Sequence, residues 1–342
     1  MAPSKIIAIV GATGTQGSSV AKVFLNLPGW HVRCITRDPT SDKAKVLAEL
    51  GVELVQAELK DVESLSRAFQ DATAIFVNTT FVEITQASLA TGADEATSSQ
   101  IAYEEELQLA NNAATAASKV PGLERYVYSA FTSIKKASEG KYAKALHWEA
   151  KAAAVEFVEN ELPQLAKKSS FIYIGGYYTN PFLLPQRNPE NGKYALVLPA
   201  PKELQFVIID AGESTGHYVR ALIEDEEPGT KLLAYDDDIS IAEAIEVWSK
   251  ISGEDAEFVQ MPMQTMHEQF GVPLGYLEAA AFVADYGYTT GIEGVITPAQ
   301  LKTRLKRPSY EEYLRSVGRE KLLEVPAPKE LSPQIASMVS DD

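Results

Sequence analysis

The sequence predicts an α/β fold in which helices cover both faces of a parallel sheet. Three observations support this class. Apolar runs of strand length alternate with helix-like segments through the first half of the chain, and a glycine-rich turn follows the first run. In addition, 45% apolar residues in a chain of 342 are enough to bury a large core. Sheets of this kind bind ligands at the carboxyl ends of their strands.

The first strand and the turn after it carry the most specific signal. Residues 5–10 form an apolar run, and Gly11, Gly14 and Gly17 follow before a helix-like stretch at 18–25. The glycines permit a sharp turn, a close approach of the backbone to a pyrophosphate, and tight packing of the helix on the sheet. Since the helix N-terminus also attracts phosphates, the pattern predicts a Rossmann-type domain that binds a dinucleotide, rather than a glycine turn without a ligand. The expected contacts come from Gly11, Thr13, Gly14, Thr15, Gln16 and Gly17.

The end of the second strand, residues 31–37, bears on the choice of dinucleotide. NAD-binding domains usually place an acid there, which accepts hydrogen bonds from the ribose 2′-OH and would repel a 2′-phosphate. Here Arg37 stands at this place, and its guanidinium can bind a phosphate in bidentate fashion, with Lys43 and Lys45 adding positive potential. Arg37 can also be read as a solvated loop residue, and Asp38 can still serve a 2′-OH. We therefore expect NADP(H), with NAD(H) as the alternative.

Charge and cysteine content exclude several classes of function. The net charge of −16 gives a surface that repels nucleic-acid phosphates and anionic lipid, so neither nucleic acid nor a membrane is an expected partner. Cys34 is the single cysteine, which excludes an intramolecular disulfide and a cysteine-based zinc cluster. The sequence shows no basic-apolar signal and no apolar run of about eighteen residues. We expect a cytoplasmic protein, with the nucleus as a further location.

The alternation of strands and helices continues along the chain. Asp61 is expected to cap one helix, and polar or small residues follow the carboxyl ends of several strands. From these ends we expect Thr79, Thr80, Phe81 and Tyr177 to contact the cofactor, with Ser129 close by. The expected strands span 5–10, 31–37, 52–57, 74–78, 125–129 and 170–174, and the expected helices span 18–25, 44–50, 61–69 and 99–118.

Several stretches together resemble the NmrA-like family of atypical short-chain dehydrogenases, and its fungal members in particular. Members bind NAD(P), and the resemblance implies one of two functions. Some members resemble isoflavone reductase and reduce small molecules, whereas others are redox-sensing regulators that bind the cofactor and a protein partner without turnover. The matching stretches are 11–17, 32–37, 125–129, 140–142, 147–151, 176–180 and 286–288.

The resemblance directs attention to Lys151. Classical enzymes of the superfamily carry Tyr-x-x-x-Lys on one helix, where the lysine binds the nicotinamide ribose and lowers the pKa of the tyrosine. Here the residue four positions before Lys151 is His147. Tyr142 lies nine positions before Lys151, about half a turn out of phase, and cannot replace the missing phenol. The classical arrangement of catalytic residues is therefore incomplete.

Two interpretations of this helix remain open. In the first, Lys151 holds the ribose or donates a proton, as the isoflavone-reductase-like relatives imply, and His147 acts as acid or base on the same face. In the second, His147 is a packed helix residue and Lys151 only anchors the ribose. Ser129 takes the place of the superfamily's catalytic serine, or is simply a polar strand end. Tyr177, Tyr178 and Asn180 either lie near the nicotinamide or serve as core aromatics and a turn asparagine.

The second half of the chain is less regular. We expect a NAD(P)-binding domain at 1–180 completed by parts of 205–250, a smaller α+β substrate or partner domain at 181–325, and a loosely held tail at 326–342. His217 and His267 lack neighbours at metal-ligand spacing, so no metal is expected. A group of apolar, adaptable side chains either lines a pocket for a hydrophobic substrate or packs in the core; its members are Met261, Met263, Met266 and Phe270.

The sequence thus favours an NADP(H)-binding oxidoreductase that reduces a small, hydrophobic carbonyl or enone compound. The alternative is a regulator that senses NAD(P) and acts through a protein partner. The lysine and the large second half favour the enzyme, whereas the missing tyrosine favours the regulator.

Overall fold

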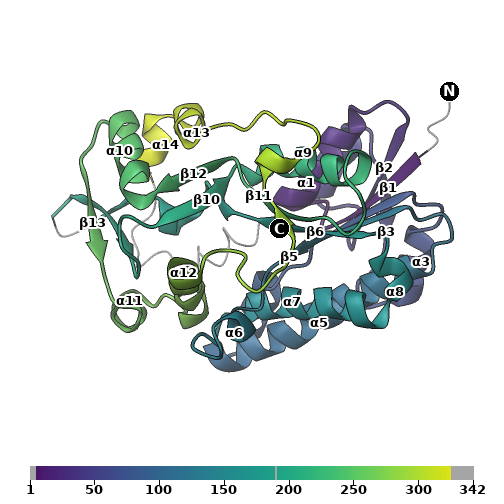
Figure 1. Ribbon diagram of the computed structural model, residues 1–342, viewed down its shortest axis with the longest axis horizontal. Helices are drawn as coiled ribbons and strands as arrows, with labels where there is room; N and C mark the ends of the chain where they lie inside the picture. Colours follow the sequence, from purple (N-terminus) through teal and green to yellow (C-terminus); the bar gives the residue numbers. More distant parts are fainter. Residues whose placement is uncertain (1–4, 189–190, 325–342) are drawn as a thin grey trace.

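The computed structural model describes residues 5–188 and 191–324, and it confirms the expected α/β class (Figure 1). Eight strands, all paired in parallel, form the central sheet in the order β3-β2-β1-β4-β5-β6-β11-β14. The expected tail at 326–342 lies outside the described residues. The strands are β1 Lys5–Val10, β2 Trp30–Thr36, β3 Glu53–Gln56, β4 Ala74–Val77, β5 Arg125–Ala130, β6 Ser169–Ile174, β11 Lys231–Ala234 and β14 Val295–Ile296.

Helices cover both faces of this sheet, as Figure 1 shows. Ile7 and Ile9 of β1 point to the face covered by α1 (Thr15–Leu25) and α9 (Ala211–Glu224). The alternate residues of β1, Ala8 and Val10, point to the face covered by three other helices. These are α3 Val62–Ala68, α5 Glu95–Ser118 and α7 Leu146–Glu161. Because both faces are buried, β4 is apolar throughout and β1 is apolar after Lys5, as expected for the central strands of a parallel sheet.

Helix starts follow local capping chemistry. The Asp61 side chain accepts hydrogen bonds from the backbone at the start of α3, as predicted. α5 begins at Glu95, four residues before the expected start at residue 99, because Asp94 caps it by accepting a hydrogen bond from the Thr97 backbone N–H. The remaining helices of this half are α2 Asp42–Glu49, α4 Val82–Ala90, α6 Ile134–Ala137 and α8 Pro163–Ala166.

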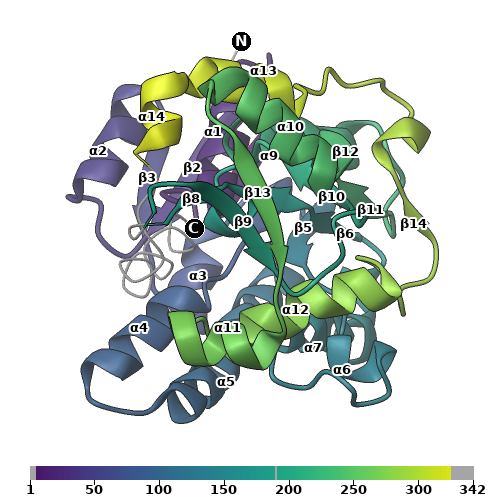
Figure 2. The same ribbon diagram turned by 90° about the vertical axis from the view of Figure 1, so that its left-hand side faces the viewer.

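Two small sheets extend beyond the carboxyl ends of the central strands. One has the order β12-β10-β7 and the other β13-β9-β8. Figure 2 shows α11 and α12 lying across this end of the molecule, beside the strands of the second small sheet. The division into two domains near residue 180 stays a prediction. The strands here are β7 Gly176–Tyr177, β8 Gln186–Arg187, β9 Tyr194–Leu198, β10 Gln205–Ile209, β12 Asp237–Ser240 and β13 Ala256–Gln260.

The helices of the second half surround these sheets. Ser240 and Ser309 each form a capping box with the glutamate three residues later, which fixes where α10 and α13 begin. The elements are α10 Ile241–Ser252, α11 Met263–Phe270, α12 Leu274–Tyr286, α13 Tyr310–Val317, α14 Arg319–Leu323, and the 3₁₀ turns η1 Pro181–Leu183 and η2 Pro298–Gln300.

α1, which follows the glycine-rich turn, is fixed by close packing against α9. The Gly216 N–H donates to the Ser19 hydroxyl at 2.9 Å, and a Cβ added at Gly216 would lie only 2.3 Å from the Ser19 carbonyl oxygen. Glycine is therefore required for this helix contact, which links the first and second halves of the chain.

We predict that Gly216→Ala lowers the free energy of unfolding by about 1–3 kcal/mol, although alanine is the better helix former, because the added methyl group pushes α9 away from α1. Gly122→Ala is the matched control, since a Cβ at Gly122 meets nothing within 4 Å. Urea unfolding measures both variants. Equal stabilities for the two would show that the helix contact is not a constraint.

Candidate nicotinamide and substrate site

A cavity of about 300 Å³ opens at the carboxyl ends of β4, β5 and β6. Segments far apart in the sequence form its walls: the start of α1, the loop after β4, helix α7, the segment around β7, and helix α12. Eight of the residues predicted for the site line the cavity, namely Gln16, Thr79, Thr80, Phe81, Ser129, His147, Lys151 and Tyr177. Of the other predicted residues, Gly11, Thr13 and Gly14 belong to the turn after β1, Thr15 and Gly17 lie in the first turn of α1, and Arg37 directly follows β2.

The turn after β1 has the geometry that a pyrophosphate requires. Gly11 has a left-handed φ of +76°, and a Cβ at Gly17 would lie 2.2 Å from the Gly11 carbonyl oxygen. Gly14 is the N-cap of α1, and no side chain caps this helix start. Glycines are thus required for the turn, and the helix N-terminus is left for an anion.

Gln16 connects this turn to the cavity. Its Nε2 donates a hydrogen bond to the Tyr177 hydroxyl at 2.7 Å. The Gln16 Oε1 is buried and has no hydrogen-bond partner among the described residues. A buried acceptor without a partner is costly, which favours a bound molecule that donates to it. Together with the glycine turn, this acceptor shows that the residues present fit a dinucleotide.

A buried ion pair lies beneath the cavity. The Lys151 ammonium is 3.3 Å from Glu106 Oε1, and the side chains are 8% and 0% exposed. Lys151 Nζ also donates to Asn78 Oδ1 at 3.0 Å and to the Thr79 carbonyl at 2.8 Å, while the Thr79 hydroxyl donates to Glu106 Oε1 at 2.8 Å. All three N–H groups of the ammonium therefore face acceptors of the protein. The charge of Lys151 is fixed at the edge of the cavity by α5 and by the end of β4.

His147 lies one helical turn from Lys151, among aromatic rings. Its ring centroid is 4.8 Å from that of Tyr276 and 5.8 Å from that of Phe81, and the residue lines the cavity. Desolvation, with the nearby Lys151 charge, lowers the pKa of His147 to about 3. The imidazole is therefore neutral at physiological pH. The neutral ring can donate or accept a hydrogen bond in the cavity, but it is not an imidazolium cation.

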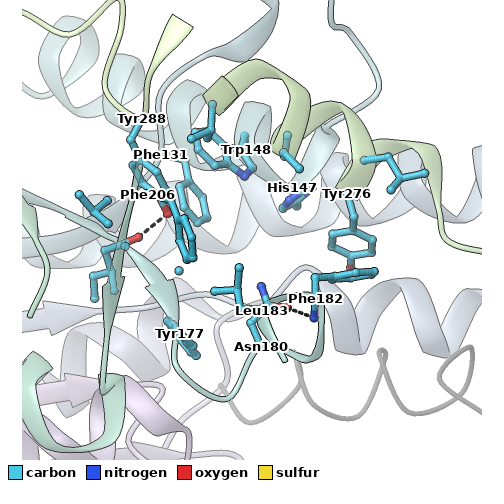
Figure 3. Close-up of a pocket in the computed structure, with 18 of the residues that line it drawn as sticks. Phe131, His147, Trp148, Tyr177, Asn180, Phe182, Leu183, Phe206, Tyr276 and Tyr288 are labelled. Atoms are coloured by element: carbon cyan, nitrogen blue, oxygen red, sulfur yellow. Dashed lines mark hydrogen bonds between the residues drawn. The ribbon is translucent and has the colours of Figure 1, made fainter. Parts of the chain in front are cut away.

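The remaining walls of the cavity are aromatic and apolar, as Figure 3 shows. Phe131 stacks on Trp148 with ring centroids 4.5 Å apart. The Tyr288 hydroxyl donates to the Ile174 carbonyl at 2.5 Å. Apolar side chains from the second half of the chain complete the lining, including Phe182, Leu183, Leu198, Phe206, Leu277 and Val283.

Several aromatic and methionine residues that were candidates for the site serve the core instead. The Tyr178 hydroxyl donates to the Pro308 carbonyl at 2.9 Å. Tyr142, which the sequence already excluded as a replacement for the missing phenol, donates a hydrogen bond from its hydroxyl to Asp285 at 2.7 Å. Asn180 lines the cavity, and its side chain also accepts from the Phe182 N–H, as a turn asparagine does. Of the two readings given for the methionine group, the structure supports core packing. Met261, Met263, Met266 and Phe270 pack in a cluster around Val272 and Leu277.

Arg37 follows directly after β2 and reaches across to α4. Its Nη2 donates to Glu83 Oε2 at 3.0 Å, and the Arg37 side chain is 70% exposed. Asp38, which was an alternative partner for a ribose hydroxyl, turns back on its own loop, where it accepts hydrogen bonds from the Thr40 backbone N–H and hydroxyl. These hydrogen bonds lower the pKa of Asp38.

Among the described residues there is no group of three or more histidine, cysteine or acidic side chains that could hold a metal ion. Nor does any helix within the described ranges combine the length and apolar character needed to cross a membrane.

Sequence reasoning missed Glu106, although a signal for it existed. The sequence has three consecutive glutamates, Glu104, Glu105 and Glu106, and composition alone does not show which of them is buried. Helical phase does, because Glu106 falls on the stripe of buried residues that includes Ala102 and Ala110. A carboxylate on the buried stripe of a helix needs a partner, and Lys151 is that partner.

Comparison with known proteins shows the family of this chain. Residues 3–314 match the model of the NmrA-like family. The NmrA-like family domain-containing oxidoreductase hkm9 of Aspergillus hancockii is 27% identical over 309 residues, which cover 85% of this chain and 84% of that protein. The oxidoreductase himF of Aspergillus japonicus is 45% identical, but over 75 residues, or 22% of this chain and 23% of that protein.

Solved structures give the same fold. The negative transcriptional regulator NmrA in complex with NADP has a TM-score of 0.65 and 21% identity, with 99% of this chain and 98% of that chain covered. The Escherichia coli NADPH-dependent quinone oxidoreductase QOR2 has a TM-score of 0.64 and 18% identity, with 91% and 99% covered. Isoflavone reductase has a TM-score of 0.66 and 14% identity, with 92% and 99% covered.

The buried ion pair leads to a prediction about stability. Glu106→Gln keeps the shape of the side chain but leaves the Lys151 charge buried without a counter-charge, so we expect a loss of about 3 kcal/mol or more in the free energy of unfolding. Lys151→Met with Glu106→Gln should cost less than the sum of the two single changes. Chemical unfolding of all four proteins measures the coupling, and strictly additive losses would contradict a direct ion pair.

The depressed pKa of His147 predicts how stability depends on pH. Between pH 6.5 and about 3 the unfolded chain binds a proton at this residue and the folded protein does not, so stability is present above pH 6.5 and is lost as the pH falls. The slope from this residue approaches about 1.4 kcal/mol per pH unit. His147→Phe should flatten the curve of unfolding free energy between pH 6.5 and 5. Parallel curves for variant and wild type would refute a neutral, desolvated imidazole.

Proposed function

This chain belongs to the NmrA-like family, and on that premise we propose that it is an NADP(H)-dependent oxidoreductase that reduces a small, apolar carbonyl or enone compound. The observation that carries the proposal is the apolar cavity into which Lys151 and Ser129 project at the carboxyl ends of the strands. A cavity of this size and lining is typical of a small-molecule site. It lies next to the turn that fits a dinucleotide, so hydride donor and acceptor can meet there.

The lining also limits the substrate. Among the described lining residues there is no carboxylate that would pair with a cationic substrate, and the Lys151 ammonium already faces three protein acceptors. Burying an unpaired charge of either sign in such a cavity is unfavourable. The favoured substrate is therefore neutral, with flat apolar groups that contact Phe131, Phe206 and Tyr276, and with one carbonyl group to be reduced.

In the proposed reaction the glycine turn would hold NADPH, which would supply the hydride for the carbonyl carbon. Negative charge then develops on the substrate oxygen, and the fixed cation of Lys151 stabilises it in a site from which water is largely excluded. The Lys151 ammonium would have to turn one N–H from Thr79 to the substrate oxygen, where its proton would complete the alcohol, and the neutral amine would then regain a proton from solvent. For an enone, hydride addition at carbon would produce an enolate. The Lys151 cation would stabilise this enolate and its proton would neutralise it.

Ser129 and His147 have supporting roles in this proposal. The Ser129 hydroxyl lines the cavity at the carboxyl end of β5, where it can donate a hydrogen bond to the substrate oxygen. His147 is neutral, so it orients the substrate by hydrogen bonding and is not the charged acid.

One observation favours a second function, that of a regulator which senses NAD(P). The helix that carries Lys151 has His147 where classical enzymes have tyrosine, and every N–H of Lys151 is already used within the protein. A protein that binds the cofactor without turnover needs no proton donor at this place. The two functions differ in whether NADPH is consumed.

The first test is a calorimetric titration with NADPH, NADP⁺, NADH and NAD⁺ in one buffer. We expect NADPH to bind at least tenfold more tightly than NADH because Arg37 can pair with the 2′-phosphate. Preference for the oxidised forms, or equal affinity for NAD⁺ and NADP⁺, would instead support the regulator.

The second test is turnover with neutral aryl ketones and enones, followed as loss of NADPH absorbance. Once a substrate is found, Lys151→Ala is expected to lower kcat by about 10²- to 10⁴-fold, the range for loss of a proton-transfer group. Lys151→Arg keeps the charge and serves as the comparison. An unchanged kcat of Lys151→Ala at saturating NADPH would remove Lys151 from the chemistry.

A further inference from the structure

The Arg37–Glu83 ion pair spans the place where the dinucleotide would lie. Arg37 comes from the end of β2, and Glu83 lies in the first turn of α4, after β4. β2 and β4 are the two neighbours of β1 in the sheet, so the pair bridges the carboxyl end of β1 and the glycine turn that follows it. A molecule seated on that turn has this bridge beside its adenosine end.

The Arg37–Glu83 ion pair places a guanidinium beside a carboxylate, and these are the two groups by which a protein can distinguish NADP from NAD. A guanidinium matches a 2′-phosphate, whereas a carboxylate accepts hydrogen bonds from a free 2′-OH and repels the phosphate. The carboxylate usually lies at the end of β2. Here Asp38 follows β2, but its carboxylate accepts hydrogen bonds from Thr40 of the same loop. Glu83 brings a carboxylate to the same place from the opposite side.

We propose that Glu83 is a specificity-determining residue that competes with the 2′-phosphate of NADP(H) for Arg37 and serves the ribose 2′-OH of NAD(H). This inference rests on the proposed binding of a nicotinamide dinucleotide. With NADP(H), the guanidinium leaves Glu83 for the phosphate. With NAD(H), the pair stays closed and the carboxylate accepts from the ribose hydroxyl.

The exposure of the two side chains makes this exchange feasible. Arg37 is 70% exposed and Glu83 is 36% exposed, so both can change partner without disturbing the core. Ion pairs of this kind are weak and are screened by salt. The competition should therefore change cofactor affinity by a small factor, and its hallmark is the opposite direction of the effect on the two cofactors.

The test is Glu83→Gln, with NADPH and NADH titrated calorimetrically at low salt. We expect NADPH to bind about two- to fivefold more tightly and NADH about three- to tenfold more weakly than in the wild type. Glu63→Gln is the matched control, because Glu63 is likewise an exposed acid in the first turn of a helix, α3, and it should leave the ratio unchanged. In an Arg37→Ala background, Glu83→Gln should no longer improve NADPH binding by this factor.

The outcomes separate this inference from the proposed function. If the wild type binds the dinucleotides but Glu83→Gln shifts both affinities in the same direction, Glu83 has only a structural or general electrostatic role and the inference is overturned. The same holds if Glu63→Gln has an equal effect. If the wild type binds neither dinucleotide, the proposed function fails and this inference fails with it.

Discussion

The buried pair of Lys151 and Glu106 is the interaction on which the site depends. It joins α7 to α5, and through Asn78 and Thr79 it joins both helices to the end of β4. A charge this deeply buried is tolerated only with a counter-charge and several hydrogen bonds. The network that meets this requirement also holds a cation at the edge of an apolar cavity. Lys151 therefore contributes both to the stability of the fold and to the proposed chemistry.

The cavity itself is a product of long-range assembly. Its polar floor comes from the carboxyl ends of the central strands, where a parallel sheet collects the loops that follow each strand. Its apolar walls come from α12 and from the segments around β7, η1 and β10. The two halves of the chain therefore contribute different chemistry to one site: the first supplies the charge, the dinucleotide turn and the aromatic wall of Phe131 and Trp148, and the second supplies the remaining apolar walls.

Much of the fold could be predicted because its signals are local. The apolar strands, the glycine turn and the capping by Asp61 each depend on residues close together in the sequence. The small sheets were less predictable, since β9 pairs in parallel with β13 and β7 with β10, and no local pattern encodes such partners. The candidate site followed the same rule. Strand ends predicted Thr79 and Ser129 at the cavity, but the contact of Glu83 with Arg37 joins exposed residues that carry no periodic signal.

We propose that the nicotinamide end of the cofactor and a neutral substrate share the cavity above the Lys151–Glu106 pair. A crystal structure of the NADPH complex tests it most directly. We predict the pyrophosphate on the glycine turn, the nicotinamide ring inside the cavity near Ser129 and Lys151, and apolar space left beside it. A nicotinamide ring outside the cavity, or a cavity closed by side chains when the cofactor binds, would contradict the claim.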